Sequence, residues 1–168
     1  DASFLLKLVN ELLDFRKSEI GGLKLTFVEA NISSQVRNLH LRFSQLIEER
    51  GLDFQLELGE KDIHAFVDKE AFKKILSNLL SNAVRYTQQG RVVVGLRRRK
   101  DGVEIQVLDT GPGLLPAQIS QLQQPFTQGP QHSNAEARQG FGLGLYIVKS
   151  LCEQNQLELR VRSTLHHG

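Results

Sequence analysis

Apolar residues recur at two spacings along the chain, and the spacings predict an alternation of helices and strands. Spacings of three and four residues predict helices over residues 3–20, 33–50, 68–88 and 144–155. Alternation and short apolar runs predict strands over residues 23–28, 52–58, 63–67, 91–99, 103–109 and 157–162. Residues 100–102 join two of these strands and are typical of a hairpin. Helices on one face of a largely antiparallel sheet give an α/β sandwich of the α+β class.

Polar residues and glycines mark where the helices begin and end. Gly21 would help to stop the first helix, and Gly51 would end the second. Ser33 and Ser34 are expected to cap the second helix. Asp68 is suited to cap the third, because a carboxylate accepts hydrogen bonds from the first unpaired backbone amides.

The segment from residue 110 to residue 135 differs from the rest of the chain in its proline content and its lack of charge. All four prolines lie between residues 112 and 130, and no Asp, Glu, Lys or Arg occurs from residue 110 to residue 135. This composition predicts a long irregular loop. Loops of that length inside a compact domain usually carry function.

Composition excludes several classes of protein. The 168 residues suit one domain with a short appendage, and a net charge of +2 is too small to favour nucleic acid or an anionic membrane as partner. Cys152 is the single cysteine, so a disulfide framework is excluded, and no run of about 18 apolar residues occurs. The chain contains no methionine, so we expect it to be part of a longer protein.

Asn78 and Asn82 lie four residues apart in the third predicted helix, and Arg85 continues their stripe. Asparagine is a weak helix former, so two of them inside a helix require a reason. Amide oxygens are hard ligands that suit Mg²⁺, and a nearby arginine suits phosphate. The alternative is a pair of solvated asparagines at the helix edge.

Asp109 ends a predicted strand and is followed by Thr-Gly-Pro-Gly. Strand alternation places it on the face of Val103, Ile105 and Val107, which should meet the helices, so its carboxylate is expected to be partly buried. Such a carboxylate needs a hydrogen-bond donor, and an adenine amino group is one. The glycines that follow let backbone approach a ligand closely. The alternative is that Asp109 only starts a turn.

Gly140, Gly142 and Gly144 alternate directly before the last predicted helix, whose N-terminal amides can bind phosphate. Neither the Walker loop nor the dinucleotide fingerprint fits this spacing. A flexible hinge is the alternative. Phe126 stands in a polar stretch and either anchors the loop or packs into the core.

The order and spacing of these features resemble the catalytic, ATP-binding domain of bacterial sensor histidine kinases, in the Bergerat-fold ATPase group. Residues 78–87 are similar to the N box of that family, residues 109–113 to its G1 box, Phe126 to its F box, and residues 140–145 to its G2 box. The likeness spans about residues 23–162. Residues 1–22 resemble the end of a dimerisation helix with its linker, which leaves residues 23–168 as the ATP-binding domain.

The resemblance implies a Bergerat-fold sandwich with a mixed, mostly antiparallel sheet, helices on one face, and a flexible ATP lid over about residues 127–139. It implies that Asn82 coordinates Mg²⁺, that Asn78 supports the metal or phosphate site, and that Arg85 contacts phosphate. Tyr86 would line the nucleotide pocket, and Asp109 would bind the adenine amino group. The remaining residues of the implied ATP site are Gly111, Gly113, Phe126, Gly140, Gly142, Leu143, Gly144 and Leu145.

Two features depart from the family pattern. Phe141 stands where the family often has a small hydroxyl residue, which puts one phosphate contact in doubt. Family members also continue, after the segment matching residues 157–162, with a glycine-led strand that this sequence lacks.

The activity implied is that of a protein-histidine kinase. The γ-phosphate of Mg-ATP would pass to a histidine on a dimerisation domain and then to an aspartate of a response regulator. In the family an acidic residue follows the acceptor histidine, and none of the five histidines here has one: His40, His64, His132, His166 and His167. We therefore expect neither acceptor nor general base in this chain. The parent is expected to be a homodimer anchored in the bacterial inner membrane, with this domain in the cytoplasm and no nucleic-acid partner.

Two other functions stay open. Conformational ATPases of the same superfamily hydrolyse ATP with a glutamate four residues before the metal-binding asparagine. Asn78 occupies that position here, which argues against activation of water. A degenerate module that only contacts other proteins is the second alternative, and the presence of Asn82, Asp109 and the alternating glycines argues against it.

Overall fold

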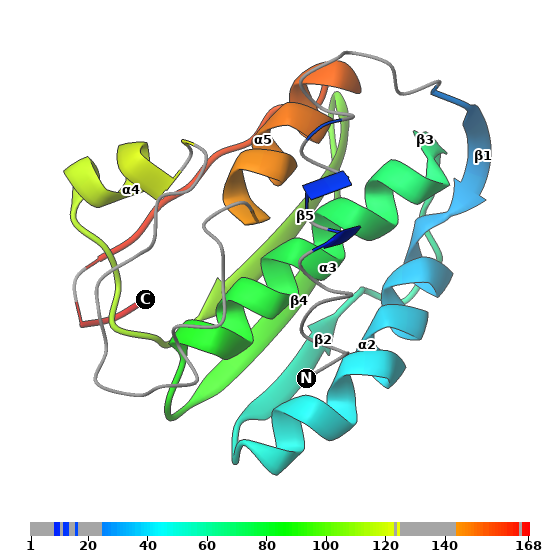
Figure 1. The fold of residues 1–168 in the computed structure, drawn as a ribbon. Coiled ribbons are helices and arrows are strands. Elements are labelled where there is room, and N and C mark those ends of the chain that lie inside the picture. Colours follow the sequence, from blue (N-terminus) through cyan, green and yellow to red (C-terminus); the bar gives the residue numbers. More distant parts are fainter. Residues whose placement is uncertain are drawn as a thin grey trace.

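In the computed structural model, helices cover one face of a β-sheet (Figure 1). The structure describes residues 9–10, 12–13, 16, 25–122, 124, 144–164 and 166–168. Helices α2 and α3 lie across the sheet, and α5 packs on α3 (Figure 1). The order of elements is β1 (Phe27–Asn31), α2 (Ile32–Glu49), β2 (Asp53–Glu57), β3 (His64–Asp68), α3 (Lys69–Tyr86), β4 (Arg91–Arg99), β5 (Gly102–Asp109), α4 (Pro116–Leu122) and α5 (Gly144–Gln154).

The strands form a three-stranded sheet and a separate pair. In the larger sheet β4 lies between β2 and β5, parallel to β2 and antiparallel to β5. The register places Asp53 opposite Arg91 and Val92 opposite Asp109. Strands β1 and β3 pair antiparallel. The predicted α+β class and the β4–β5 hairpin are therefore confirmed.

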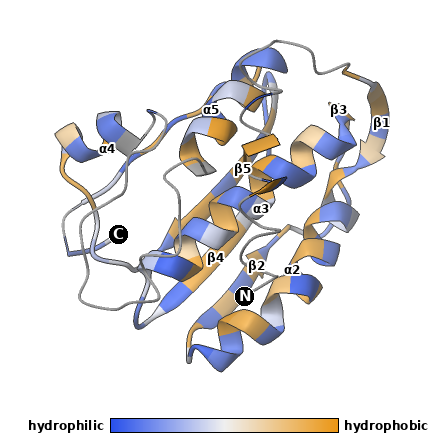
Figure 2. Ribbon diagram, viewed as in Figure 1, coloured by the Kyte–Doolittle hydropathy of each residue, from blue (hydrophilic) through white to orange (hydrophobic). Residues whose placement is uncertain are grey.

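The core is centred on β4, α2 and α3. Five successive residues of β4 are buried, so both faces of this strand are shielded from water. Figure 2 shows the resulting hydrophobic band along β4, beneath helices whose hydrophobic and hydrophilic residues alternate. Buried members of the main cluster include Ile32, Val36, Leu76, Leu80, Val92, Val94 and Leu96. This core holds the C-terminal half of α3 against the sheet.

The cap of α3 is confirmed and the predicted cap of α2 is wrong. Asp68 Oδ1 accepts from the Ala71 backbone N–H at 2.9 Å, and Oδ2 accepts from that of Thr26 at 2.7 Å. These bonds, the Ala71 bond most strongly, lower the pKa of Asp68 against the opposing effect of burial. Helix α2 is capped by Asn31, whose side chain accepts from Ser34 N at 3.0 Å. Ser33 lies inside the helix, and its hydroxyl instead accepts from Ile63 N.

Two strand predictions need correction. The strand expected over residues 23–28 lies at Phe27–Asn31. Asn31 caps α2, so the strand runs up to the start of that helix, and the pairing with β3 fixes its register. Residues 157–162 form no strand. They follow a turn in which Leu157 N donates to Cys152 O, and the segment is then held through Ser163, whose hydroxyl accepts from Leu114 N. The alternating pattern is present, but among the residues that the structure describes none pairs with this segment in a sheet.

The predicted loop over residues 110–135 contains a helix, α4. Pro116 occupies its first position, where the missing backbone N–H costs nothing, and Leu115 N donates to the Gln118 side chain at 2.7 Å. Most of the remaining loop lies outside the described residues, and so does the lid predicted over residues 127–139.

The helices and strands predicted elsewhere are present within two residues of their expected bounds. In the first predicted helix, the described residues Val9, Asn10, Leu12, Leu13 and Arg16 are helical and exposed. Gly21 and Gly22 lie outside the described residues. Among the helices described, none is both long and apolar enough to cross a bilayer.

Candidate nucleotide-binding site

Helix α3 carries four of the predicted site residues near its C-terminal end. Asn78 and Asn82 are half-buried, and the side-chain amide nitrogen of Asn78 donates to Lys74 O at 2.9 Å. That bond fixes the nitrogen end of the amide and leaves Oδ1 available as a ligand. Arg85 and Tyr86 follow in the last turn and are also half-buried. The two asparagines are thus partly shielded from water, and their role at a metal or phosphate site stays a prediction.

Asp109 is the last residue of β5 and is half-buried, as the sequence predicts. Its Oδ1 accepts a hydrogen bond from the Gly111 backbone N–H at 2.9 Å. On the same face Val103 and Val107 pack against the core, whereas Ile105 is 37% exposed and contributes less than expected. One carboxylate oxygen is thus occupied by the local turn, and the other is available to a donor.

Gly111 brings the end of β5 against the end of α3. A Cβ atom at this position would lie 2.8 Å from Asp109 Oδ1, 3.2 Å from Thr87 Oγ1 and 3.4 Å from Tyr86 O. No larger residue fits without displacing the carboxylate or the backbone. Gly113 has a φ of 71°, in the left-handed region that favours glycine. Gly111 therefore allows the close approach of β5 to α3, and Gly113 supplies the left-handed backbone of the turn that follows.

Thr87 is a residue that the sequence reasoning did not single out. It ends α3, is 1% exposed, and its hydroxyl has no hydrogen-bond partner among the described residues. Its position directly after the asparagine-bearing helix was the one feature of the sequence that could have drawn attention to it. Burial is a tertiary property, however, and no local pattern indicated it.

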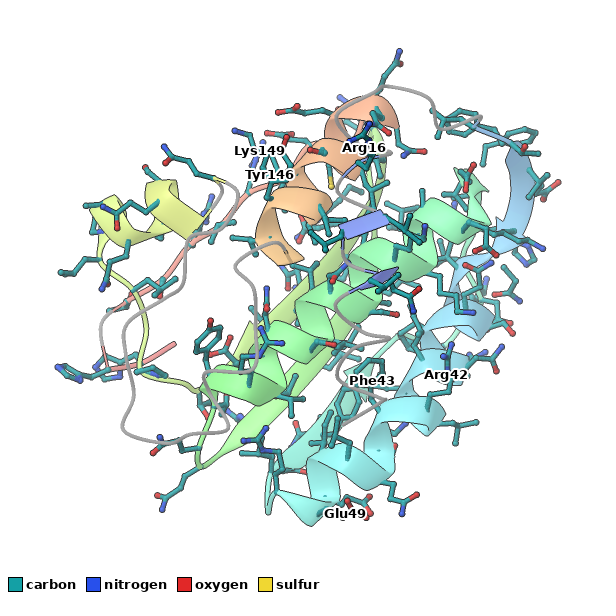
Figure 3. The ribbon with its side chains drawn as sticks, viewed as in Figure 1. Arg16, Arg42, Phe43, Glu49, Tyr146 and Lys149 are labelled. Carbon is teal, nitrogen blue, oxygen red and sulfur yellow. The ribbon has the colours of Figure 1, made fainter. Side chains whose placement is uncertain are left out.

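Helix α5 begins at Gly144 and is held against α3 by apolar contacts. Ile147 and Leu151 pack against Ala71. Figure 3 shows Tyr146 and Lys149 on this helix, whereas Arg42, Phe43 and Glu49 lie on α2, away from it. Gly144 and Leu145 therefore lie at the start of α5, which packs on α3, the helix that bears Asn78 and Asn82. The roles predicted for Phe126, Gly140, Gly142 and Leu143 fall on residues outside those the structure describes.

The donor atoms of the candidate residues limit the metals that they could hold. Within the described ranges no three His, Cys, Asp or Glu residues gather in a group able to bind a metal ion. The amide oxygens of Asn78 and Asn82 are neutral hard donors, which suit Mg²⁺ when phosphate and water supply its remaining ligands. The residues present fit a magnesium ion bound together with a nucleotide.

Other chemically notable residues have structural explanations. Burial raises the pKa of the Cys152 thiol to about 11, with a smaller effect from Glu153, so this cysteine is a poor nucleophile. The basic run over residues 97–100 is exposed, and within it Arg97 pairs with Glu57 and Arg99 with Glu104. His64 is an exposed residue of β3.

Comparison with known families gives the class of protein. Residues 67–168 match the family described as histidine kinase-, DNA gyrase B- and HSP90-like ATPases. The match includes α3, β5 and α5, the elements that carry the described candidate residues. The chain belongs to this family.

Individual relatives narrow the resemblance to sensor histidine kinases. The autoinducer 2 sensor kinase/phosphatase LuxQ of Vibrio vulnificus is 32% identical over 171 residues, covering 98% of this chain and 20% of LuxQ. Full-length ShkA in complex with AMPPNP is 28% identical with a TM-score of 0.78, covering 89% of this chain and 31% of ShkA. The histidine kinase ThkA in complex with the response regulator TrrA is 25% identical with a TM-score of 0.63, covering 75% of this chain and 37% of ThkA. The resemblance derived from the sequence is confirmed, and the chain spans about a fifth of LuxQ.

Proposed function

We propose that this chain is the ATP-binding catalytic domain of a two-component sensor histidine kinase. It binds Mg-ATP and donates the γ-phosphate to a histidine on a dimerisation domain, from which the phosphate passes to an aspartate of a response regulator. The observation that carries the proposal is the half-buried carboxylate of Asp109, bounded by Gly111 and Thr87 and lying next to the asparagine-bearing helix α3.

The base is bound at Asp109. Because Oδ1 already accepts from Gly111 N, Oδ2 is the oxygen available to the adenine 6-amino group. Partial burial strengthens this hydrogen bond, since water competes less for the carboxylate. Tyr86 is the last residue of α3, and its ring would line the pocket for the base.

The phosphates are bound along α3. Asn82 would hold Mg²⁺ through its amide oxygen, Asn78 would support the ion or a phosphate oxygen, and Arg85 would pair with phosphate. When bound, the ion neutralises negative charge on the phosphate oxygens. Gly144 and Leu145 are the first residues of α5, and backbone amides at the N-terminus of a helix are suited to phosphate.

The transfer itself requires a second domain. The bond between the γ-phosphorus and the β,γ-bridging oxygen breaks, a phosphorus–nitrogen bond forms on the imidazole, and the imidazole proton passes to a base beside the acceptor. This chain supplies orientation and charge stabilisation for that displacement. The relative ThkA, solved in complex with the response regulator TrrA, supports a parent that pairs with a response regulator. A homodimeric parent anchored in a membrane is part of the same proposal.

Nucleotide titration with a base-site variant tests the binding half of the proposal. Calorimetry should show ATP binding that strengthens with Mg²⁺. Asp109→Asn should weaken it at least about tenfold, a loss of about 1.4 kcal/mol, because an amide replaces the accepting carboxylate. Asp101→Asn, in the exposed turn between β4 and β5, is the matched control and should bind like the parent. Equal affinity of Asp109→Asn and parent would show that the adenine contact is assigned wrongly.

A phosphotransfer assay tests the catalytic half. With ATP labelled at the γ-phosphate, the chain should label a dimerisation domain supplied in trans, on histidine, and should label itself little. Asn82→Ala should abolish the dependence on Mg²⁺ together with most of the labelling. ATP hydrolysis without phosphohistidine would instead identify a conformational ATPase.

A further inference from the structure

Thr110 is the first residue after β5, and its side chain completes the hydrogen bonding between β4 and β5. The last pair of the strand register joins Val92 to Asp109. One step further, Thr110 N donates to Arg91 O at 3.1 Å. In a regular antiparallel pair Arg91 N would donate in return to the Thr110 carbonyl, but here it donates to the Thr110 hydroxyl at 2.9 Å. Because the hydroxyl replaces the main-chain carbonyl, the chain can leave the sheet directly after Asp109.

The turn that precedes β4 holds the same hydroxyl from the other side. Thr110 Oγ1 donates to Gln89 O at 3.2 Å. Gly90 has a φ of 106°, and a Cβ atom on it would overlap Thr110 Oγ1. Gly90 O in turn accepts from Asp53 N at 3.0 Å, which ties this turn to the start of β2. Thr110 is therefore bonded to a turn that is itself anchored in the sheet.

The direction in which the chain leaves β5 decides how the Asp109 carboxylate is oriented. Gly111 follows Thr110, and its backbone N–H donates to Asp109 Oδ1 at 2.9 Å. A Cβ atom on Gly111 would lie 3.4 Å from Tyr86 O, so this residue lies close against the end of α3. A change of main-chain direction at Thr110 therefore moves the donor that orients the carboxylate.

We propose that Thr110 is a positioning residue for nucleotide binding, whose hydroxyl ends the β4–β5 ladder at Asp109 and thereby fixes the direction of the carboxylate. This inference rests on the proposed function, in which that carboxylate binds the adenine 6-amino group. In this role Thr110 acts through Asp109 and need not touch the nucleotide. Thr110 is an exposed residue, so water competes for its hydrogen bonds and a moderate effect on affinity is expected.

The variant Thr110→Val tests the proposal, because valine keeps the branched shape and removes the hydroxyl. Calorimetry well below the melting temperature should show ATP binding weakened about three- to tenfold, since Arg91 N loses its acceptor. Thr110→Ser keeps the hydroxyl and should bind ATP within about twofold of the parent. Ser44→Ala is the control: it removes a hydroxyl that donates to His40 O within α2 and should leave the affinity for ATP unchanged. A serine variant as weak as the valine variant would overturn the role of the hydroxyl.

Purine riboside triphosphate, which lacks only the 6-amino group of ATP, separates positioning from a general structural role. It cannot make the contact with Asp109, so Thr110→Val should change its affinity by less than about twofold. Combined with Asp109→Asn, Thr110→Val should weaken ATP binding no further than Asp109→Asn alone, because both substitutions remove one contact. Equal losses for both ligands, or independent losses in the double variant, would show that Thr110 only stabilises the fold.

The two proposals fail differently. If the parent binds ATP and Asp109→Asn does not, but Thr110→Val binds ATP as the parent does, the role of Thr110 is wrong while the proposed function stands. If the parent binds no ATP, the proposed function is wrong and this inference with it.

Discussion

The absence of a single side-chain carbon, the Cβ of Gly111, determines how closely β5 approaches α3. A Cβ there would lie 2.8 Å from the Asp109 carboxylate, a distance that real Cβ atoms essentially never show. The carboxylate is already oriented by the backbone N–H of the same glycine. One residue therefore both positions the acceptor and leaves room beside it.

Gly111→Ala should weaken ATP binding at least about tenfold, which corresponds to about 1.4 kcal/mol. The added methyl group must displace Asp109 Oδ1 or the Thr87 hydroxyl, and either shift disturbs the base site. Calorimetric titration with ATP measures the loss.

Gly95→Ala is the matched control for Gly111→Ala. Gly95 lies in β4, and a Cβ there would have nothing nearer than 3.8 Å, an ordinary contact. Affinity for ATP should be unchanged, and the free energy of unfolding should rise by up to about 1 kcal/mol, because alanine loses less backbone entropy than glycine. Equal effects of the two substitutions on ATP binding would argue against a base site at Gly111.

Site residues could be predicted from the sequence where local spacing determines their position. Strand alternation predicted the partial burial of Asp109, and helical spacing predicted that Asn78 and Asn82 lie on one face of their helix. The buried state of Thr87 could not be predicted, because it depends on the approach of Gly111 from a distant strand. The greater exposure of Ile105 likewise depends on how far the helices extend over the sheet.

At the scale of elements, the start of α3 depends on one carboxylate. Asp68 accepts from Ala71 N inside the helix and from Thr26 N before β1, so it joins the helix to the chain that precedes the β1–β3 pair. Both bonds lower the pKa of Asp68, and the bond from Ala71 has the larger effect. The ionised form is therefore favoured by folding.

Replacing Asp68 should cost stability in a pH-dependent way. Asp68→Ala should lower the free energy of unfolding by about 1–2 kcal/mol at pH 7, and Asp68→Asn by less, because an amide oxygen can still accept from Ala71 N. Since the folded pKa lies below the unfolded value of about 4, the contribution is complete above that pH and is lost as pH falls through the folded pKa. Urea unfolding between pH 3 and pH 7 should show parent and Asp68→Asn converging at the acidic end.

The control for this series is Asp101→Asn, whose carboxylate lies in an exposed turn. Its free energy of unfolding should follow the parent at every pH. A constant difference between parent and Asp68→Asn across the range would show that the charge of Asp68 contributes nothing to the cap.

Element boundaries were predicted less well than the elements themselves. Ser33 and Ser34 have the chemistry of a cap, but Asn31 caps α2 because the β1–β3 register places it at the helix start. Pro116 indicated a break, yet proline is also compatible with the first turn of a helix. Residues 157–162 have the alternation of a strand, which is not sufficient without a partner for their backbone.

At the scale of the whole molecule, nucleotide binding should be coupled to folding. The proposed base site joins residues of α3 and β5, so it exists only when these two elements are packed together. A ligand that binds the folded state alone adds about 2.7 kcal/mol of stability at one hundred times its dissociation constant. For a domain of this size that is a rise in Tm of about 5–10 °C.

A thermal melt with Mg-ATP at one hundred times the measured dissociation constant checks this rise. Asp109→Asn at the same ATP concentration should show a smaller rise, in proportion to its weaker binding. A full rise in that variant would place the stabilising nucleotide somewhere other than beside Asp109.

The parallel pairing of β2 with β4 has a consequence for how the chain acquires its structure. Asp53 pairs with Arg91, so β3 and all of α3 lie between these partners in the sequence. The β4–β5 hairpin closes over a turn of two residues, whereas β2 must wait for a much larger loop to close at an entropic cost. The rate at which β2 docks should therefore limit the speed at which newly made chains mature, and substitutions in β2 should slow refolding more than equally destabilising ones in β5.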